Sequence, residues 1–199
     1  METLAPMNAA VPGIAYIKET ITDKGDLSKI KKAVVEKRDA GIAWGAVYAQ
    51  YQEDIDKVTS HGEGLQVEKK FYVESVVGDK KELLPINADN QLKMGDKVVS
   101  RITIKLDRSM DFVQLKDQRG ACFEPINNLS GYVWNRSTSY YVAVKDASTN
   151  FFFDSLSKGV CVLEHSYRVS RTGTYESGLA VIQSAYAPEY AAHSASTKV

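Results

Sequence analysis

The sequence has few cysteines, no long apolar run and no excess of charge of either sign. Only two of its 199 residues are cysteines, Cys122 and Cys161, which excludes a scaffold held by several disulfides. No run of about 18 apolar residues occurs, so a membrane-spanning helix is not expected. Lys+Arg and Asp+Glu both number 25. A chain of zero net charge has no electrostatic reason to bind nucleic acid or an anionic membrane.

The two cysteines and the N-terminus leave the cellular compartment open. Cys122 and Cys161 lie in different expected strands, so they form one disulfide if those strands are neighbours and otherwise remain two buried thiols, which is the favoured interpretation. The stretch Met1–Pro6 has no basic region followed by an apolar one, so no signal peptide is predicted. The chain is therefore either cytoplasmic or a piece of an exported protein.

Residues that could carry chemistry are also scarce. The histidines, His61, His165 and His193, do not have the spacing of metal ligands, and His165 shares an apolar face with Leu163 and Tyr167, which is typical of a core or boundary histidine. No nucleophile, base and acid can be assembled into a catalytic set. We therefore expect no enzyme activity, no cofactor and no metal site.

One segment comes close to an internal thioester site. Such a site needs a cysteine thiol and a glutamine amide in the spacing Cys-x-Glu-Gln. The chain reads Cys122-Phe123-Glu124-Pro125, and Pro125 has no side-chain amide. A thioester cannot form at this position.

What the sequence does contain is a repeated strand pattern. Hydrophobic residues make up 44% and charged residues 25%, which is enough to bury a core. Apolar and polar residues alternate with period two, as at Leu65, Val67 and Phe71, and Gly or Asp turn signals separate the runs. Strands are expected over residues 65–74, 81–86, 98–107, 112–115, 140–145, 150–154, 160–169 and 179–186. No amphipathic helix separates them, so the predicted fold is an all-β, antiparallel β-sandwich.

The sequence divides into two parts. Residues 1–61 are expected to form a smaller N-terminal β segment, with strands near 14–17, 33–38 and 42–51. His61-Gly62-Glu63-Gly64 is rich in glycine and has no apolar anchor, so it is predicted to be a linker before the sandwich of residues 65–199. Within the sandwich, residues 124–139 are expected to be a long loop and residues 191–199 a polar tail.

Aromatic residues gather around the long loop. Tyr132, Trp134, Tyr140 and Tyr141 lie within ten residues of one another. If their rings were exposed, they would form a platform for a sugar or a partner protein. The alternative, that they fill the core of the sandwich, is favoured because aromatic residues are common in strands.

Several segments, in the same order, resemble the C-terminal region of bacterial α2-macroglobulin family proteins, especially the Bacteroidetes type. They are Gly41–Tyr48, Leu65–Lys70, Gly95–Ser100, Asp111–Asp117, Tyr167–Tyr175 and Tyr186–Tyr190. The resemblance implies that residues 1–61 are the closing strands of a CUB-like β domain. It also implies that residues 65–199 are the final macroglobulin domain, a β-sandwich.

The resemblance implies a function too. Family members inhibit proteases by trapping them, so this chain would be a non-catalytic structural and interaction module of such an inhibitor. Its partners would be the other domains of the same protein and, indirectly, the target proteases. It would lie in the periplasm or at the cell surface, as part of a longer exported protein.

The resemblance also singles out Tyr186. In bacterial members a tyrosine in a Met-Tyr-x-Pro-Glu motif shields the thioester from water. Tyr186, Pro188 and Glu189 match that motif, although Ala185 replaces the methionine. The alternative is a tyrosine that caps the core at a strand end.

Two other functions stay open. The first is a free-standing glycan- or protein-binding module that uses Tyr132 and Trp134. The second, ranked far lower, is a β-sandwich hydrolase.

Overall fold

The computed structural model describes residues 18, 20–22, 29–32, 34, 36, 40–87, 90–134 and 138–199. The chain forms two compact units, residues 1–50 and 51–199. In the first unit, the described residues form neither helix nor strand, and all of them are exposed. The second unit contains the strands of the sandwich and one short 3₁₀ helix, η1 (Ile55–Lys57).

The strand expected over residues 42–51 is not formed. Its apolar residues Ile42, Trp44 and Tyr48 are almost fully exposed. A period-two pattern yields a strand only where a neighbouring strand accepts its backbone hydrogen bonds and a core covers one face. The described part of the first unit offers neither. The strand expected at 14–17 lies outside the described residues. Of the strand expected at 33–38, only Val34 and Glu36 are described, and neither is in a strand.

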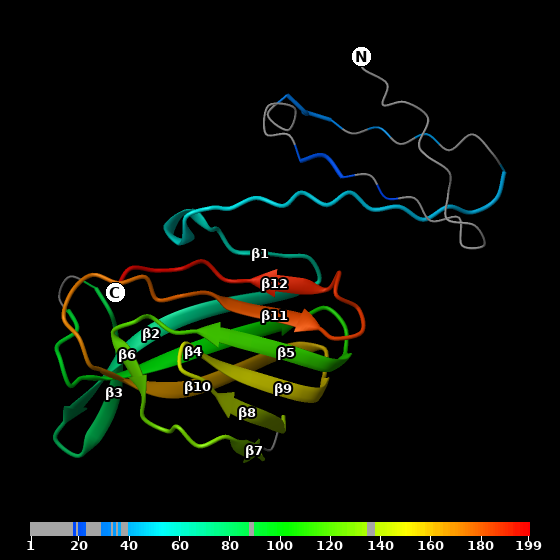
Figure 1. Ribbon diagram of the computed structural model, residues 1–199. Coiled ribbons are helices and arrows are strands. Elements are labelled where there is room, and N and C mark those ends of the chain that lie inside the picture. Colours follow the sequence, from blue (N-terminus) through cyan, green and yellow to red (C-terminus); the bar gives the residue numbers. More distant parts are fainter. Residues whose placement is uncertain are drawn as a thin grey trace. The chain divides into compact units, whose positions relative to one another are not determined.

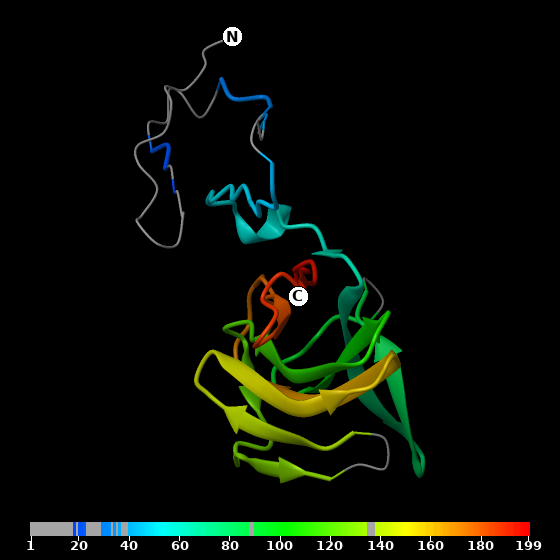
Figure 2. The ribbon, with the colours of Figure 1, turned by 90° about the vertical axis from the view of Figure 1, so that its right-hand side faces the viewer.

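The second unit is a sandwich of two antiparallel sheets (Figures 1 and 2). The larger sheet has the order β1 (His61–Gly62), β12 (Ala191–His193), β11 (Ala180–Ser184), β5 (Met110–Gln118), β9 (Ser148–Leu156), β8 (Tyr140–Val144) and β7 (Gly131–Val133). The smaller sheet has the order β3 (Lys80–Pro85), β2 (Leu65–Val77), β4 (Lys97–Leu106), β10 (Gly159–Val169) and β6 (Phe123–Pro125). The predicted all-β antiparallel sandwich is confirmed.

The alternation of side chains explains which face of each strand is buried. In β4, Val98, Ser100, Ile102, Ile104 and Leu106 all point into the sandwich. Strand β4 pairs with β2 on one side and with β10 on the other, so it lies in the middle of its sheet. The tight turn from β2 to β3 uses Gly78 at φ 63°, a backbone angle that side chains other than glycine rarely adopt.

The interior contains two groups of packed side chains. The larger group joins the two sheets and includes Ile102, Leu115, Phe153 and Ile182. The smaller group includes Phe71, Phe123 and Tyr167, whose rings stack with centroids 5.4 and 5.6 Å apart. Burial of these side chains supplies most of the driving force for folding.

Three local predictions are corrected by the structure. The segment His61–Gly64 is not a free linker, because His61–Gly62 is strand β1 and pairs with β12. Gly62 is required there, since a Cβ atom would lie 2.5 Å from the Cβ of Ala192. The expected polar tail, residues 191–199, contains strand β12. Val199 in this tail exchanges two backbone hydrogen bonds of 2.9 Å with Tyr175. The expected loop over 124–139 contains strand β7.

Candidate interaction surfaces

An exposed aromatic pair lies where β5 begins and β11 has ended. Tyr186 is 80% exposed and Phe112 is 51% exposed, and their rings meet edge to face with centroids 5.2 Å apart. Phe112 has φ 52°, which is costly for a residue with a side chain. The Ala185 N–H donates to the Phe112 carbonyl at 2.9 Å. We call Phe112 and residues 185–190 the Tyr186 corner.

The loop of the Tyr186 corner is held in one conformation by several contacts. The Tyr190 N–H donates to the Ala187 carbonyl at 2.9 Å, and the Ser184 N–H donates to the Tyr190 carbonyl at 3.0 Å. The Arg108 guanidinium donates to the Tyr190 hydroxyl at 2.9 Å and lies over its ring. Pro188 and Glu189 are exposed on this loop. A large aromatic surface is therefore presented on a rigid support.

The second exposed aromatic surface lies on the edge strand β7, the residue that follows it and the neighbouring strand β8. Tyr132 is 64% exposed and Trp134 is 80% exposed, and their rings stack at 5.9 Å between centroids. Tyr141 meets Tyr132 edge to face. The favoured prediction that these aromatics fill the core is wrong for Tyr132 and Trp134. It holds for Tyr140, which packs on Phe151 and Phe153.

A buried polar cluster, which sequence analysis missed, lies between the two sheets. Lys69 of β2 and Asp117 of β5 form an ion pair with 2.6 Å between Nζ and Oδ1, and their side chains are 1% and 0% exposed. The other carboxylate oxygen, Oδ2, accepts a hydrogen bond of 2.9 Å from the Tyr167 hydroxyl. It also lies 2.8 Å from His165 Nε2. The prediction that His165 is a core or boundary histidine is confirmed.

Burial and neighbouring charges shift the pKa values of Lys69, Asp117 and Tyr167 in the cluster. Burial lowers the pKa of Lys69, although Asp117 opposes the shift. Burial raises the pKa of Asp117, but the hydrogen bond from His165 and the charge of Lys69 outweigh it and hold that pKa below its usual range. Burial and the neighbouring Asp117 raise the pKa of the Tyr167 hydroxyl well above 10.

A signal for this cluster was present in the sequence. In the alternation of β2, Lys69 falls on the same face as Leu65, Val67 and Phe71. A lysine on the core face of a strand needs a buried partner. The identity of that partner could not be read from the sequence, because Asp117 lies on a strand of the opposite sheet.

The cysteines and the other potential metal ligands among the described residues do not form a reactive or metal-binding site. Both cysteines are free thiols, but only Cys122 is buried as favoured, whereas Cys161 is partly buried; burial raises the pKa of each. Among the described residues, no group of three or more His, Cys, Asp or Glu side chains is placed to hold a metal ion. The same residues include no helix with the length and apolar character needed to cross a membrane.

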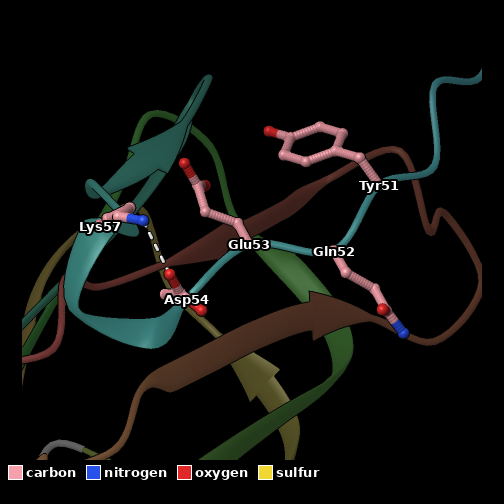
Figure 3. Close-up of a pocket in the computed structure, with 5 residues that line it drawn as sticks. All are labelled: Tyr51, Gln52, Glu53, Asp54 and Lys57. Carbon is pink, nitrogen blue, oxygen red and sulfur yellow. Dashed lines mark hydrogen bonds and ion pairs between the residues drawn. The ribbon is translucent and has the colours of Figure 1, made fainter.

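A surface depression near η1 is lined by five exposed residues, Tyr51, Gln52, Glu53, Asp54 and Lys57 (Figure 3). Lys57 donates to Asp54 at 2.7 Å, and the other three side chains point in different directions (Figure 3). Because all five are exposed to water, the depression offers no enclosed site for a reaction.

Comparison with known proteins decides the family. A family model of the bacterial α2-macroglobulin MG10 domain matches residues 64–189. The chain belongs to this family. No curated protein matches the sequence. The MG10 match covers the two sheets except β1 and β12, and it contains the Tyr186 corner as far as Glu189.

Solved structures share the MG10 fold. Salmonella α2-macroglobulin reacted with methylamine matches with a TM-score of 0.54 and 17% identity, over 69% of this chain and 9% of that one. Escherichia coli α2-macroglobulin activated by porcine elastase matches with a TM-score of 0.55 and 17% identity, over 70% of this chain and 13% of that one. This chain thus spans about a tenth of the length of these macroglobulins. The resemblance noted in the sequence is supported for the MG10 part.

Proposed function

We propose that this chain is a non-catalytic structural and interaction module of a bacterial α2-macroglobulin-like protease inhibitor, which acts by trapping its target. The observation that carries the proposal is the Tyr186 corner. It exposes two aromatic rings on a loop fixed by hydrogen bonds. Exposed aromatic surface on a rigid support is typical of a docking site for a neighbouring domain. The MG10 family match supports this interpretation.

The proposal has further parts. Residues 1–61 would be the closing strands of a CUB-like domain of a Bacteroidetes-type protein. Such strands pair with the rest of their domain, which accounts for the exposure of Ile42, Trp44 and Tyr48 in this chain. The parent protein would be exported to the periplasm or the cell surface. Tyr186 would cover a thioester held in another domain, while Pro188 and Glu189 keep the loop in place.

A protease assay tests the proposal. The purified chain is added to a protease, alone and together with the remaining domains of the macroglobulin, and cleavage of a large protein and of a small peptide is measured. A trap excludes large substrates but admits small ones, so we expect inhibition of protein cleavage only when both parts are present. Inhibition by the chain alone would contradict the proposal. So would full inhibition by the other domains without it.

A specific observation supports a second candidate, a free-standing glycan- or protein-binding module. Tyr132 of the edge strand β7 and Trp134, just after that strand, are stacked and exposed, and such a platform suits the apolar face of a sugar ring. A glycan array with the wild-type chain and Trp134→Ala tests this candidate. Loss of a bound glycan in the variant would support it. An empty array with the folded wild type would count against a glycan ligand.

A further inference from the structure

The buried pair Lys69–Asp117 joins the two sheets at a point from which water is excluded. Lys69 belongs to β2 of the five-stranded sheet and Asp117 to β5 of the seven-stranded sheet. The Lys69 nitrogen and a carboxylate oxygen of Asp117 are 2.6 Å apart, and both side chains are almost completely buried. The ring of Phe71 lies 4.9 Å from the same nitrogen. A nucleophile and a carboxyl group are thus held in contact at a buried site.

We propose that Lys69 and Asp117 condense to an amide, so that an isopeptide bond covalently links β2 to β5. The site is a modification site built from residues of this chain alone, and the inference does not rest on the proposed function. Holding two reacting groups in contact replaces a bimolecular encounter by an intramolecular step, which lowers the entropic part of the barrier.

The environment favours the neutral product. A buried ion pair loses the hydration of two charges, and its mutual attraction compensates for that loss only in part. Condensation removes both charges and releases one water molecule. Burial favours the un-ionised amine of Lys69, whereas the hydrogen bond from His165 and the charge of Lys69 favour the carboxylate of Asp117. The condensation therefore begins with transfer of a proton from the Lys69 ammonium to the Asp117 carboxylate within the pair.

The reaction balances without another reagent. One proton passes from Lys69 Nζ to Asp117 Oδ1, which gives an amine and a carboxylic acid. The nitrogen lone pair then forms a bond to Cγ, and the electrons of the C=O bond move to Oδ2. A second proton passes from Nζ to Oδ1, the Cγ–Oδ1 bond breaks, and water leaves as the C=O bond to Oδ2 re-forms. The ammonium and the carboxylate become an amide and one water molecule.

Two neighbours are placed to stabilise the charge that develops on Oδ2. The Tyr167 hydroxyl donates to this oxygen at 2.9 Å, and His165 Nε2 lies 2.8 Å from it and 2.5 Å from the Tyr167 hydroxyl, so the His165 N–H is shared between the two oxygens. His165 Nδ1 is buried without a hydrogen-bond partner, which agrees with the tautomer that carries its proton on Nε2. Two donors aimed at one oxygen form the arrangement of an oxyanion hole. Tyr167 and His165 are therefore positioning residues for the condensation.

Backbone carbonyls orient the amine. Lys69 Nζ lies 2.6 Å from the Gln118 carbonyl, 3.1 Å from that of Ser177 and 3.3 Å from that of Gly178. A neutral amine has two N–H groups, which the two nearer carbonyls satisfy. Its lone pair is then left on the side of Asp117.

The intact mass of the purified, denatured chain tests the proposal. We expect a mass lower than that of the sequence by one water, about 18 Da. After digestion with trypsin, we expect a branched peptide in which Val58–Lys70, uncut after Lys69, is joined to Asp117–Arg119. A wild-type chain that is folded, has been kept at neutral pH and shows the full sequence mass would overturn the proposal and leave an ion pair only.

Variants give matched controls. Lys69→Arg keeps the positive charge but cannot form the bond, so it should show its full mass. Asp117→Asn should lose ammonia instead of water, about 17 Da, because the leaving group changes while the acyl carbon stays. Tyr167→Phe should lower the fraction of linked chain in freshly purified protein. A loss of mass that persisted in Lys69→Arg would overturn the assignment even if one of the other variants failed to fold.

Discussion

Strand β5 carries two contrasting environments. Near its end, Asp117 is buried in the polar cluster and contacts the opposite sheet. Near its start, Phe112 is exposed and supports Tyr186. The cluster can affect a partner only through folding, whereas the Tyr186 corner makes few contacts that folding requires. The comparison teaches that stability and partner binding depend on different residues of the same strand. Substitutions at Asp117 should therefore change stability, whereas substitutions at the Tyr186 corner should change partner binding.

The largest effect on stability is expected at Asp117. Asp117→Leu removes both the charge partner of Lys69 and the carboxyl group of the proposed amide, and it leaves the Lys69 charge buried alone, which should lower the free energy of unfolding by at least about 3–5 kcal/mol in urea titrations. The double variant Lys69→Met with Asp117→Leu should recover part of that loss, because no unpaired charge remains. Lys70→Met is the matched control on the exposed face and should change stability by less than about 0.5 kcal/mol. Equal losses of stability in Asp117→Leu and Lys70→Met would contradict the comparison.

A smaller effect is expected at Tyr167. Tyr167→Phe removes the hydrogen bond to Asp117 and should cost about 1–3 kcal/mol. The pKa of the Tyr167 hydroxyl is raised in the folded state, so between about pH 10 and that raised pKa the unfolded chain has lost a proton that the folded chain retains. The stability due to this group is therefore complete below pH 10 and declines as the pH rises above it. Unfolding of wild type and Tyr167→Phe at pH 8–11 measures the difference, and parallel pH profiles would refute this account.

The smallest of these three effects on stability is expected at Phe112. Unlike the substitutions at Asp117 and Tyr167, a substitution here should stabilise the fold. Phe112→Gly relieves a backbone angle of φ 52° and should raise the free energy of unfolding by about 1 kcal/mol. Phe152 is the control, since it is an exposed phenylalanine of the neighbouring strand β9 without a positive φ angle. Phe152→Gly should lower stability by about 0.5–1 kcal/mol. Destabilisation by Phe112→Gly would show that this ring contributes to folding.

Much of the sandwich could be predicted from the sequence, because period-two alternation and turn residues such as Gly78 and Asp146 are local signals. The β2–β3 and β8–β9 hairpins are examples. The short strands β1, β7 and β12 could not be predicted, since two or three residues show no period and form strands only because a neighbour pairs with them. The strand prediction at 42–51 was wrong for the opposite reason. The segment has the period-two pattern, but no strand among the described residues pairs with it.

The candidate sites were predicted less well than the fold. Tyr132 and Trp134 were identified as aromatic residues around a long loop and Tyr186 by its resemblance to a family motif, but their exposure depends on which face of a strand or loop is covered. The buried cluster was missed because it joins Lys69, Asp117 and His165 across the sandwich, with no short spacing between them.

The most direct test of the central claim compares Tyr186→Ala with Tyr186→Phe in the complete macroglobulin. The side chain is exposed, so neither variant should change the stability of this chain by more than about 0.5 kcal/mol. If the ring docks on a neighbouring domain, Tyr186→Ala should lose protection of a large protein substrate from the protease, and Tyr186→Phe should retain most of it. Equal protection by wild type and Tyr186→Ala would contradict the account.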